Sequence, residues 1–111
     1  MASVPIAHSP SPATDSIETQ FRRLERQWKA DTAHLSSSTK IMNHPALREI
    51  VAMGRAVVPL MLEDLRRGPD LWVWVLPEMT GADPVAPADR GVIEKMTRSW
   101  LSWADQNGYR Q

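Results

Sequence analysis

The sequence contains no cysteine, which excludes disulfides, thiolate catalysis and zinc sites with cysteine ligands. The net charge is zero, because the charges of the 13 basic and 13 acidic side chains cancel. This balance argues against a protein whose main task is to grip a phosphate backbone. No apolar run approaches the roughly 20 residues that a membrane helix needs, and the N-terminus lacks the basic and then apolar pattern of a signal peptide. We therefore expect a soluble, cytoplasmic protein with no membrane partner.

Phenylalanine and tyrosine are scarce, with one of each, whereas tryptophan occurs five times. Tryptophan fills large volumes, carries an N–H group that needs a partner, and is enriched at protein interfaces. The length of 111 residues suits one domain with a single core. Residues 1–13 hold three prolines and show no apolar periodicity, so we predict a disordered arm there. A single helical domain is expected over residues 14–111.

Apolar residues recur at helical spacing in five segments, which predicts an all-α fold. The first segment begins near Asp15, a capping residue followed three positions later by Glu18. It places Phe21, Leu24 and Trp28 on one face. The other helices are predicted at about residues 45–53, 55–67, 71–80 and 88–107. We therefore expect a compact bundle of about five helices.

Prolines and hydroxyl side chains mark the boundaries of these segments. Pro45 suits the first turn of a helix, with Asn43 or His44 as the cap. Pro59 also lies in a first turn, where it removes no hydrogen bond. Residues 35–40 read as a connector, because their hydroxyl groups compete with helix hydrogen bonds.

Residues 71–80 are β-prone in composition. A strand needs a partner, however, and the chain has no second strand-like run, so we predict a helix closed by Gly81. On that helix Trp74 projects about 200° from Trp72, on the side of Leu71 and Glu78. The helix is then apolar nearly all round. Either it is buried on two sides, or it shows Trp74 to a partner.

Three successive apolar segments end in glycine, at Gly54, Gly68 and Gly81. In Gly54-Arg55-Ala56-Val57-Val58-Pro59-Leu60 a glycine precedes a helix that begins almost as Ala-Val-x-Pro-Leu, and residues 45–81 thereby resemble HEAT-like helical repeats. Residues 21–109 also resemble a group of short, uncharacterised bacterial proteins. The motifs of this second resemblance are Trp28-Lys29, Leu35-Ser36-Ser37, His44-Pro45-Ala46, Gly54 with Pro59-Leu60, and Thr80-Gly81 to Val85. The first resemblance implies a HEAT-like hairpin at the centre of the fold and a protein-binding scaffold, although the chain is too short for a solenoid.

No pattern in the chain indicates a reaction. Ser37 and Lys40 match the Ser-x-x-Lys motif of serine acyl-enzymes, but the accompanying Ser-Asp-Asn and Lys-Thr-Gly motifs are missing. His34 and His44 do not show a metal-ligand spacing, and His44 is better explained as a helix cap. No convergent set of titratable residues appears. We therefore expect no enzyme, no cofactor, no metal and no small-molecule substrate.

A basic face on the first predicted helix is a candidate nucleic-acid site. Its residues are Arg22, Arg23, Arg26 and Lys29. Glu25 interrupts this face, and no helix-turn-helix fingerprint supports base reading, so a solvated face is favoured.

Our main hypothesis is a small accessory or antitoxin-like module that binds another protein through its helical surface. Trp74, Leu71 and Glu78 are the predicted contact residues, because tryptophan is enriched among interface anchors. The alternative is a DNA-binding regulator that uses the basic face of the first helix.

Overall fold

The structure, a computed structural model, describes residues 12–109, with side chains from residue 17 onward. Regular structure in this part of the chain is entirely helical, which confirms the all-α class. Its α-helices are α1 (Pro12–Thr32), α2 (Ser38–Met42), α3 (Pro45–Ala52), α4 (Val58–Arg67), α5 (Trp72–Thr80) and α6 (Ile93–Gln106). The 3-10 helices are η2 (Gly54–Val57) and η3 (Pro87–Asp89). None of the helices in residues 12–109 combines the length and the apolar character that crossing a membrane requires.

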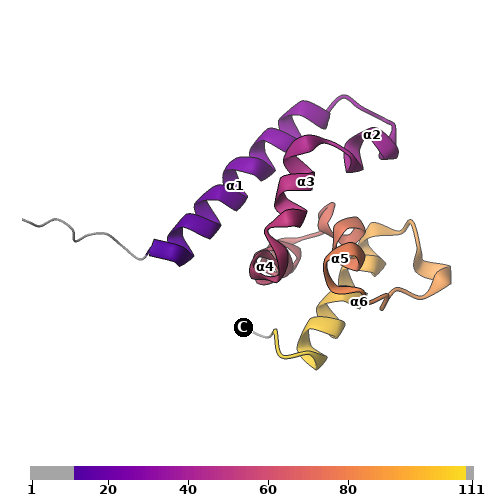
Figure 1. Cartoon of the computed structure of the whole chain (residues 1–111). Coiled ribbons are helices and arrows are strands. Elements are labelled where there is room, and N and C mark those ends of the chain that lie inside the picture. Colours follow the sequence, from indigo (N-terminus) through magenta and orange to yellow (C-terminus); the bar gives the residue numbers. More distant parts are fainter. Residues whose placement is uncertain (1–11, 110–111) are drawn as a thin grey trace, which may run out of the picture. The chain divides into compact units, whose positions relative to one another are not determined.

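The chain divides after Met53 into two compact units. Unit 1 contains α1, α2 and α3, and unit 2 contains the residues from Gly54 onward (Figure 1). The single helical domain expected over residues 14–111 stays a prediction, and so does the HEAT-like hairpin.

The disordered arm predicted over residues 1–13 lies outside the described residues except at its end. Pro12 and Ala13 form the start of α1, so the helix begins earlier than the predicted start near Asp15. The reason is that the first turn of a helix accepts proline, whose missing N–H would have no partner there.

In unit 1, α1 and α3 pack side by side, and the connection between them carries α2 (Figure 1). Phe21, Leu24 and Trp28 are spaced at three and four residues, share one face of α1 and are all buried, as predicted. Leu47 and Ile50 are buried residues of α3.

The prediction of a connector over residues 35–40 is wrong for its second half, where α2 begins. Ser37 caps α2, because its Oγ accepts a hydrogen bond from the backbone N–H of Lys40 at 3.3 Å. At the other end, Trp28 Nε1 donates to the carbonyl oxygen of Ile41 at 2.8 Å. A helix of five residues is unstable alone, so the contact with buried Trp28 explains why α2 forms.

In unit 2, α4 contacts both α5 and α6, and α5 contacts α6. The buried residues of α4 include an apolar stripe formed by Val58, Met61, Leu62 and Leu65. Pro59 lies in the first turn of α4, as predicted. The α-helix starts at Val58 rather than near Arg55, because the residues that follow Gly54 form the tighter turn η2.

α5 confirms the choice of helix over strand for residues 71–80. Gly81 ends the helix with a φ of 76°, a left-handed conformation that glycine adopts without steric cost. Its N–H donates to the carbonyl oxygen of Pro77 at 2.8 Å.

α6 begins at Ile93, later than the predicted start near Ala88. Residues around Ala88 instead form η3, and Gly91 follows with a φ of 90°. Met96 and Trp100 are buried on one face of α6.

Candidate functional site

Trp74 is the large aromatic side chain that α5 leaves exposed. Successive side chains of a helix point about 100° apart around the helix axis. A helix that packs against other helices on one side therefore leaves some of its side chains exposed. In α5 the buried residues are Trp72, Val73, Val75 and Leu76. Trp74 is 42% exposed, so α5 is not buried on both sides.

The other two predicted contact residues share the side of α5 that carries Trp74. Glu78 lies one turn after Trp74 and is exposed, and Leu71 lies one turn before it and is half-buried. The structure therefore brings the three predicted residues together along one helix face.

A groove in unit 2 adjoins Trp74, with a volume of about 450 Å³. α5, the loop between α5 and α6, and α6 each contribute to it. The lining residues central to the site are Trp74, Pro77, Val85, Met96 and Trp100. Leu71 and Glu78 do not line the groove. The sequence did not assign Pro77, Val85 or Met96 to a site, because the groove is lined by three segments that lie apart in the sequence.

The groove carries no unbalanced charge. Its charged lining residues are Asp83 and Arg90, and they form an ion pair with each other at 2.8 Å. Both side chains are exposed, so this pair lies at the solvent side of the groove. The rest of the lining is predominantly apolar.

Trp100 is fully buried and lines the groove from α6. Its Nε1 has no hydrogen-bond partner within residues 12–109. The Trp100 ring meets the edge of Trp103 at 5.3 Å between centroids, and Trp103 stacks on Tyr109 at 5.6 Å. Arg66 of α4 donates to the carbonyl oxygen of Tyr109. These contacts hold the C-terminal part of α6 against α4.

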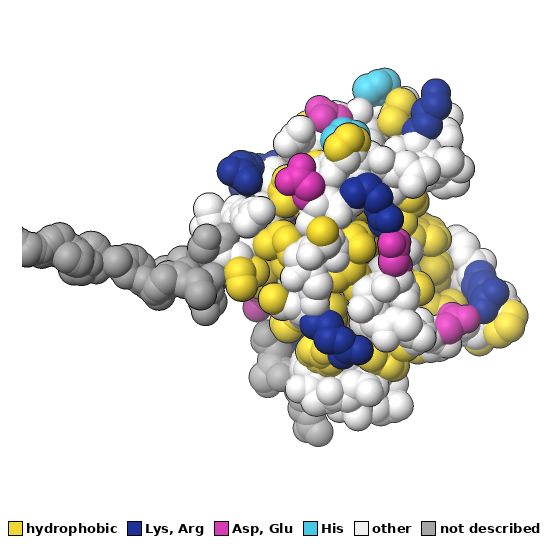
Figure 2. All heavy atoms as spheres, in the orientation of Figure 1, with side chains coloured by type: hydrophobic (Ala, Val, Ile, Leu, Met, Phe, Trp, Pro, Cys, Tyr) yellow, Lys and Arg dark blue, Asp and Glu magenta, His cyan; other side chains and the backbone are white. Residues whose placement is uncertain are grey.

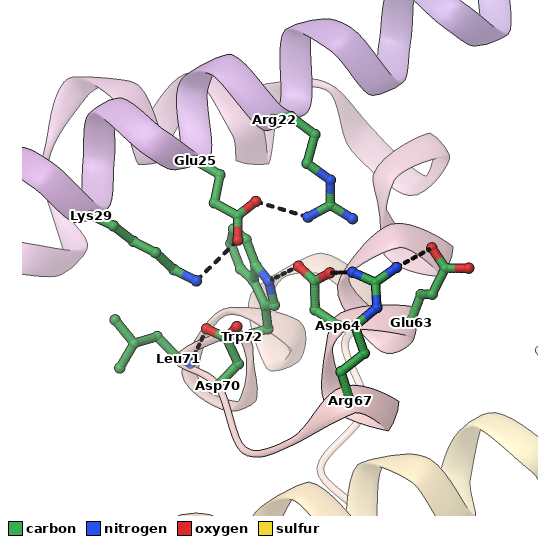
Figure 3. A network of polar contacts seen from close by, with 9 residues as sticks. All are labelled: Arg22, Glu25, Lys29, Glu63, Asp64, Arg67, Asp70, Leu71 and Trp72. Atoms are coloured by element: carbon green, nitrogen blue, oxygen red, sulfur yellow. Dashed lines mark hydrogen bonds and ion pairs between the residues drawn. The ribbon is translucent and has the colours of Figure 1, made fainter.

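The start of α5 is held by a buried hydrogen bond to α4 (Figure 3). Trp72 Nε1 donates to Asp64 Oδ2 at 2.8 Å, and both residues are buried. Arg67 lies 3.5 Å from the same carboxylate of Asp64. Asp70 accepts the backbone N–H of Leu71 at 2.6 Å. Together these contacts determine where α5 begins and how it is rotated about its axis.

The predicted basic face of α1 is partly neutralised by its own helix (Figure 3). Glu25 is only 9% exposed and accepts from Arg22 at 2.8 Å and from Lys29 at 3.0 Å. The i,i+4 spacing of Glu25 and Lys29 on one helix favours this pair. Arg23 and Arg26 are the exposed members of the set.

Acidic side chains also share the surface around this face. Glu18 lines the same surface hollow as Arg22 and Arg26, which has a volume of about 520 Å³. On the face of the molecule drawn in Figure 2, acidic side chains occur among the basic ones. This distribution is unlike the continuous basic stripe of a nucleic-acid interface.

The two remaining candidates have structural roles. Ser37 accepts the N–H of Lys40 as the cap of α2, so its hydroxyl group has a structural role. His44 caps α3, as predicted, through Nδ1, and its Nε2 contacts Asp31. His34 is exposed. Because both ring nitrogens of His44 are engaged, they are not open to a metal as placed.

Comparison with known proteins does not extend these observations. No protein-family model matches the chain, and neither curated proteins nor solved structures gave a match. The resemblances to HEAT-like repeats and to short bacterial proteins stay predictions.

Proposed function

We propose that this chain is a small accessory or antitoxin-like module that binds another protein through unit 2. The exposed Trp74 beside the groove is the observation that carries the proposal. Tryptophan is enriched at protein interfaces and among the residues that supply most of the binding energy. A partner that covers the exposed part of the indole gains apolar burial at no cost in charge desolvation.

The groove limits the chemistry of the partner segment that enters it. A charged side chain placed there would lose its hydration, while Asp83 and Arg90 already neutralise each other. The segment is therefore apolar and uncharged, and it lies against Trp74 and Pro77. Leu71 and Glu78 then belong to the rim of the contact.

The alternative of a DNA-binding regulator has less support. Binding to a duplex strengthens with each phosphate that a basic side chain neutralises. On α1, Glu25 already pairs with Arg22 and Lys29, which leaves Arg23 and Arg26 as the exposed cations of the predicted face.

The test compares two side chains of nearly equal exposure. Trp74 is 42% exposed beside the groove, and Val92 is 41% exposed but does not line it. A tagged chain captures its partner from the native host, and the affinity of the purified partner is then measured for each variant. Trp74→Ala should weaken binding by at least about thirtyfold, which corresponds to a loss of about 2 kcal/mol. Val92→Ala should change the affinity by less than about twofold.

Thermal melts separate a binding defect from a folding defect. Trp74→Ala should melt close to the wild type, whereas Trp100→Ala should be strongly destabilised because Trp100 is fully buried. If Trp74→Ala retains the partner as well as Val92→Ala does, this surface is not the binding site. If Trp74→Ala melts as low as Trp100→Ala, Trp74 has a role in folding instead.

A further inference from the structure

His44 engages both nitrogens of its ring within unit 1. Nδ1 accepts a hydrogen bond from the backbone N–H of Ala46 at 3.0 Å, which makes His44 the N-cap of α3. Nε2 lies 3.0 Å from Oδ2 of Asp31, near the end of α1. The His44 side chain is 17% exposed, whereas that of Asp31 is 51% exposed. His44 thus links the start of α3 to the end of α1.

These two contacts determine the tautomer of the ring. An amide N–H can only donate, so Nδ1 must carry the lone pair that accepts it. Neutral imidazole has one N–H, which is therefore on Nε2 and donates to Asp31. No other neutral form satisfies both contacts.

We propose that His44 is a pH-sensitive cap, which releases the N-terminus of α3 when the ring takes up a second proton. The new proton would go to Nδ1, where two N–H groups would then face each other across 3.0 Å. The imidazolium must turn away from Ala46, and the first turn of α3 loses its side-chain cap.

Charged side chains lie on each of the elements next to His44. On α1, the carboxylate of Asp31 contacts Nε2. Lys40 is the one charged side chain of α2, and α3 carries Arg48 and Glu49 in the turn after His44. A cationic ring can keep Asp31 as a partner while it gives up Ala46, so protonation moves His44 from capping α3 to pairing with α1.

Nuclear magnetic resonance tests both steps on the full chain. At neutral pH the ring nitrogen signals of His44 should show an unprotonated Nδ1 and a protonated Nε2. As the ring titrates, the Ala46 amide should lose about fivefold or more of its protection from hydrogen exchange, which corresponds to a cap of roughly 1 kcal/mol. Exchange rates are corrected for the intrinsic effect of pH, and the Ile50 amide within α3 serves as the internal reference.

Two variants distinguish the cap from a general effect of acid. His44→Asn keeps a capping side chain that does not titrate, so Ala46 should stay protected over the same pH range. His34→Asn replaces an exposed histidine and should leave the loss at Ala46 unchanged. The proposal is overturned by a proton on Nδ1 at neutral pH, by constant protection at Ala46 during the titration, or by an equal loss in His44→Asn. It is equally overturned if His44 stays neutral down to the pH at which the chain unfolds, because the cap then never opens in the folded protein.

Discussion

Truncation of Trp28 provides a direct test of how unit 1 is held together. Its ring is fully buried on α1, and its Nε1 donates to the carbonyl oxygen of Ile41 in α2. Trp28→Ala removes both the ring and the hydrogen bond, whereas Trp28→Phe keeps most of the ring and removes only the bond. The pair of variants therefore separates packing from hydrogen bonding.

The two variants should lose different amounts of the free energy of unfolding. Trp28→Ala leaves a cavity and should cost about 3–5 kcal/mol of the free energy of unfolding. Trp28→Phe should cost about 1–2 kcal/mol, because a hydrogen bond contributes little net energy unless its partner is left unsatisfied. The carbonyl oxygen of Ile41 keeps the backbone N–H of His44 at 3.4 Å as a second donor, so it is not left without a partner.

Urea unfolding followed by circular dichroism measures both losses. The midpoint should shift while the slope stays near that of the wild type. Trp74→Phe is the matched control, since the same change on an exposed ring should stay within about 0.5 kcal/mol. A loss below about 1 kcal/mol for Trp28→Ala would refute the packing argument. Equal losses for the two Trp28 variants would mean that the hydrogen bond alone holds α2 in place.

Three further predictions concern the other contacts. Asp64→Ala should destabilise the protein by about 1–3 kcal/mol because it leaves the buried indole N–H of Trp72 without this acceptor. Asp64→Asn should destabilise it less, and urea unfolding measures the free energy that each variant loses. Arg23→Glu combined with Arg26→Glu should leave duplex DNA binding unchanged in a fluorescence assay at physiological salt, because the wild type is expected to show none; salt-dependent, sub-micromolar binding by the wild type would favour the DNA-binding alternative. Deletion of residues 1–11 should leave the melting temperature nearly unchanged, since this segment is rich in proline and lacks apolar periodicity; a drop of several degrees would show that it contributes to folding.

Rules based on neighbouring residues were sufficient to predict helix boundaries that depend on contacts between neighbouring residues. His44 caps α3 because its side chain reaches an amide two residues ahead. Gly81 ends α5 because it adopts a positive φ. Pro59 is tolerated because it lies in a first turn. Each of these features depends on a few adjacent residues and can be read without knowing the fold.

Rules of this kind fail where the structure of a segment depends on a residue that is distant in the sequence. The composition of α2 favours a connector, and the helix forms where Ser37 caps one end and Trp28 binds the other, thirteen residues away from Ile41. The groove depends on the path of the loop between α5 and α6, which no periodicity describes. Val85, the buried residue of that loop, therefore could not be assigned to a site from the sequence.

The exposure of Trp74 depends both on the local periodicity of α5 and on a contact with a distant residue. α5 is apolar nearly all round, so periodicity alone cannot decide which side faces solvent. The buried indole of Trp72 needs an acceptor, and Asp64 supplies it from within the buried stripe of α4. This bond sets the rotation of α5 about its axis, and Trp74, about 200° away from Trp72, then lies on the opposite side of the helix. A carboxylate among apolar residues is thus the sequence signal that could have been used. It follows that Asp64→Ala should disturb the position of Trp74 and weaken partner binding, although Asp64 does not line the groove.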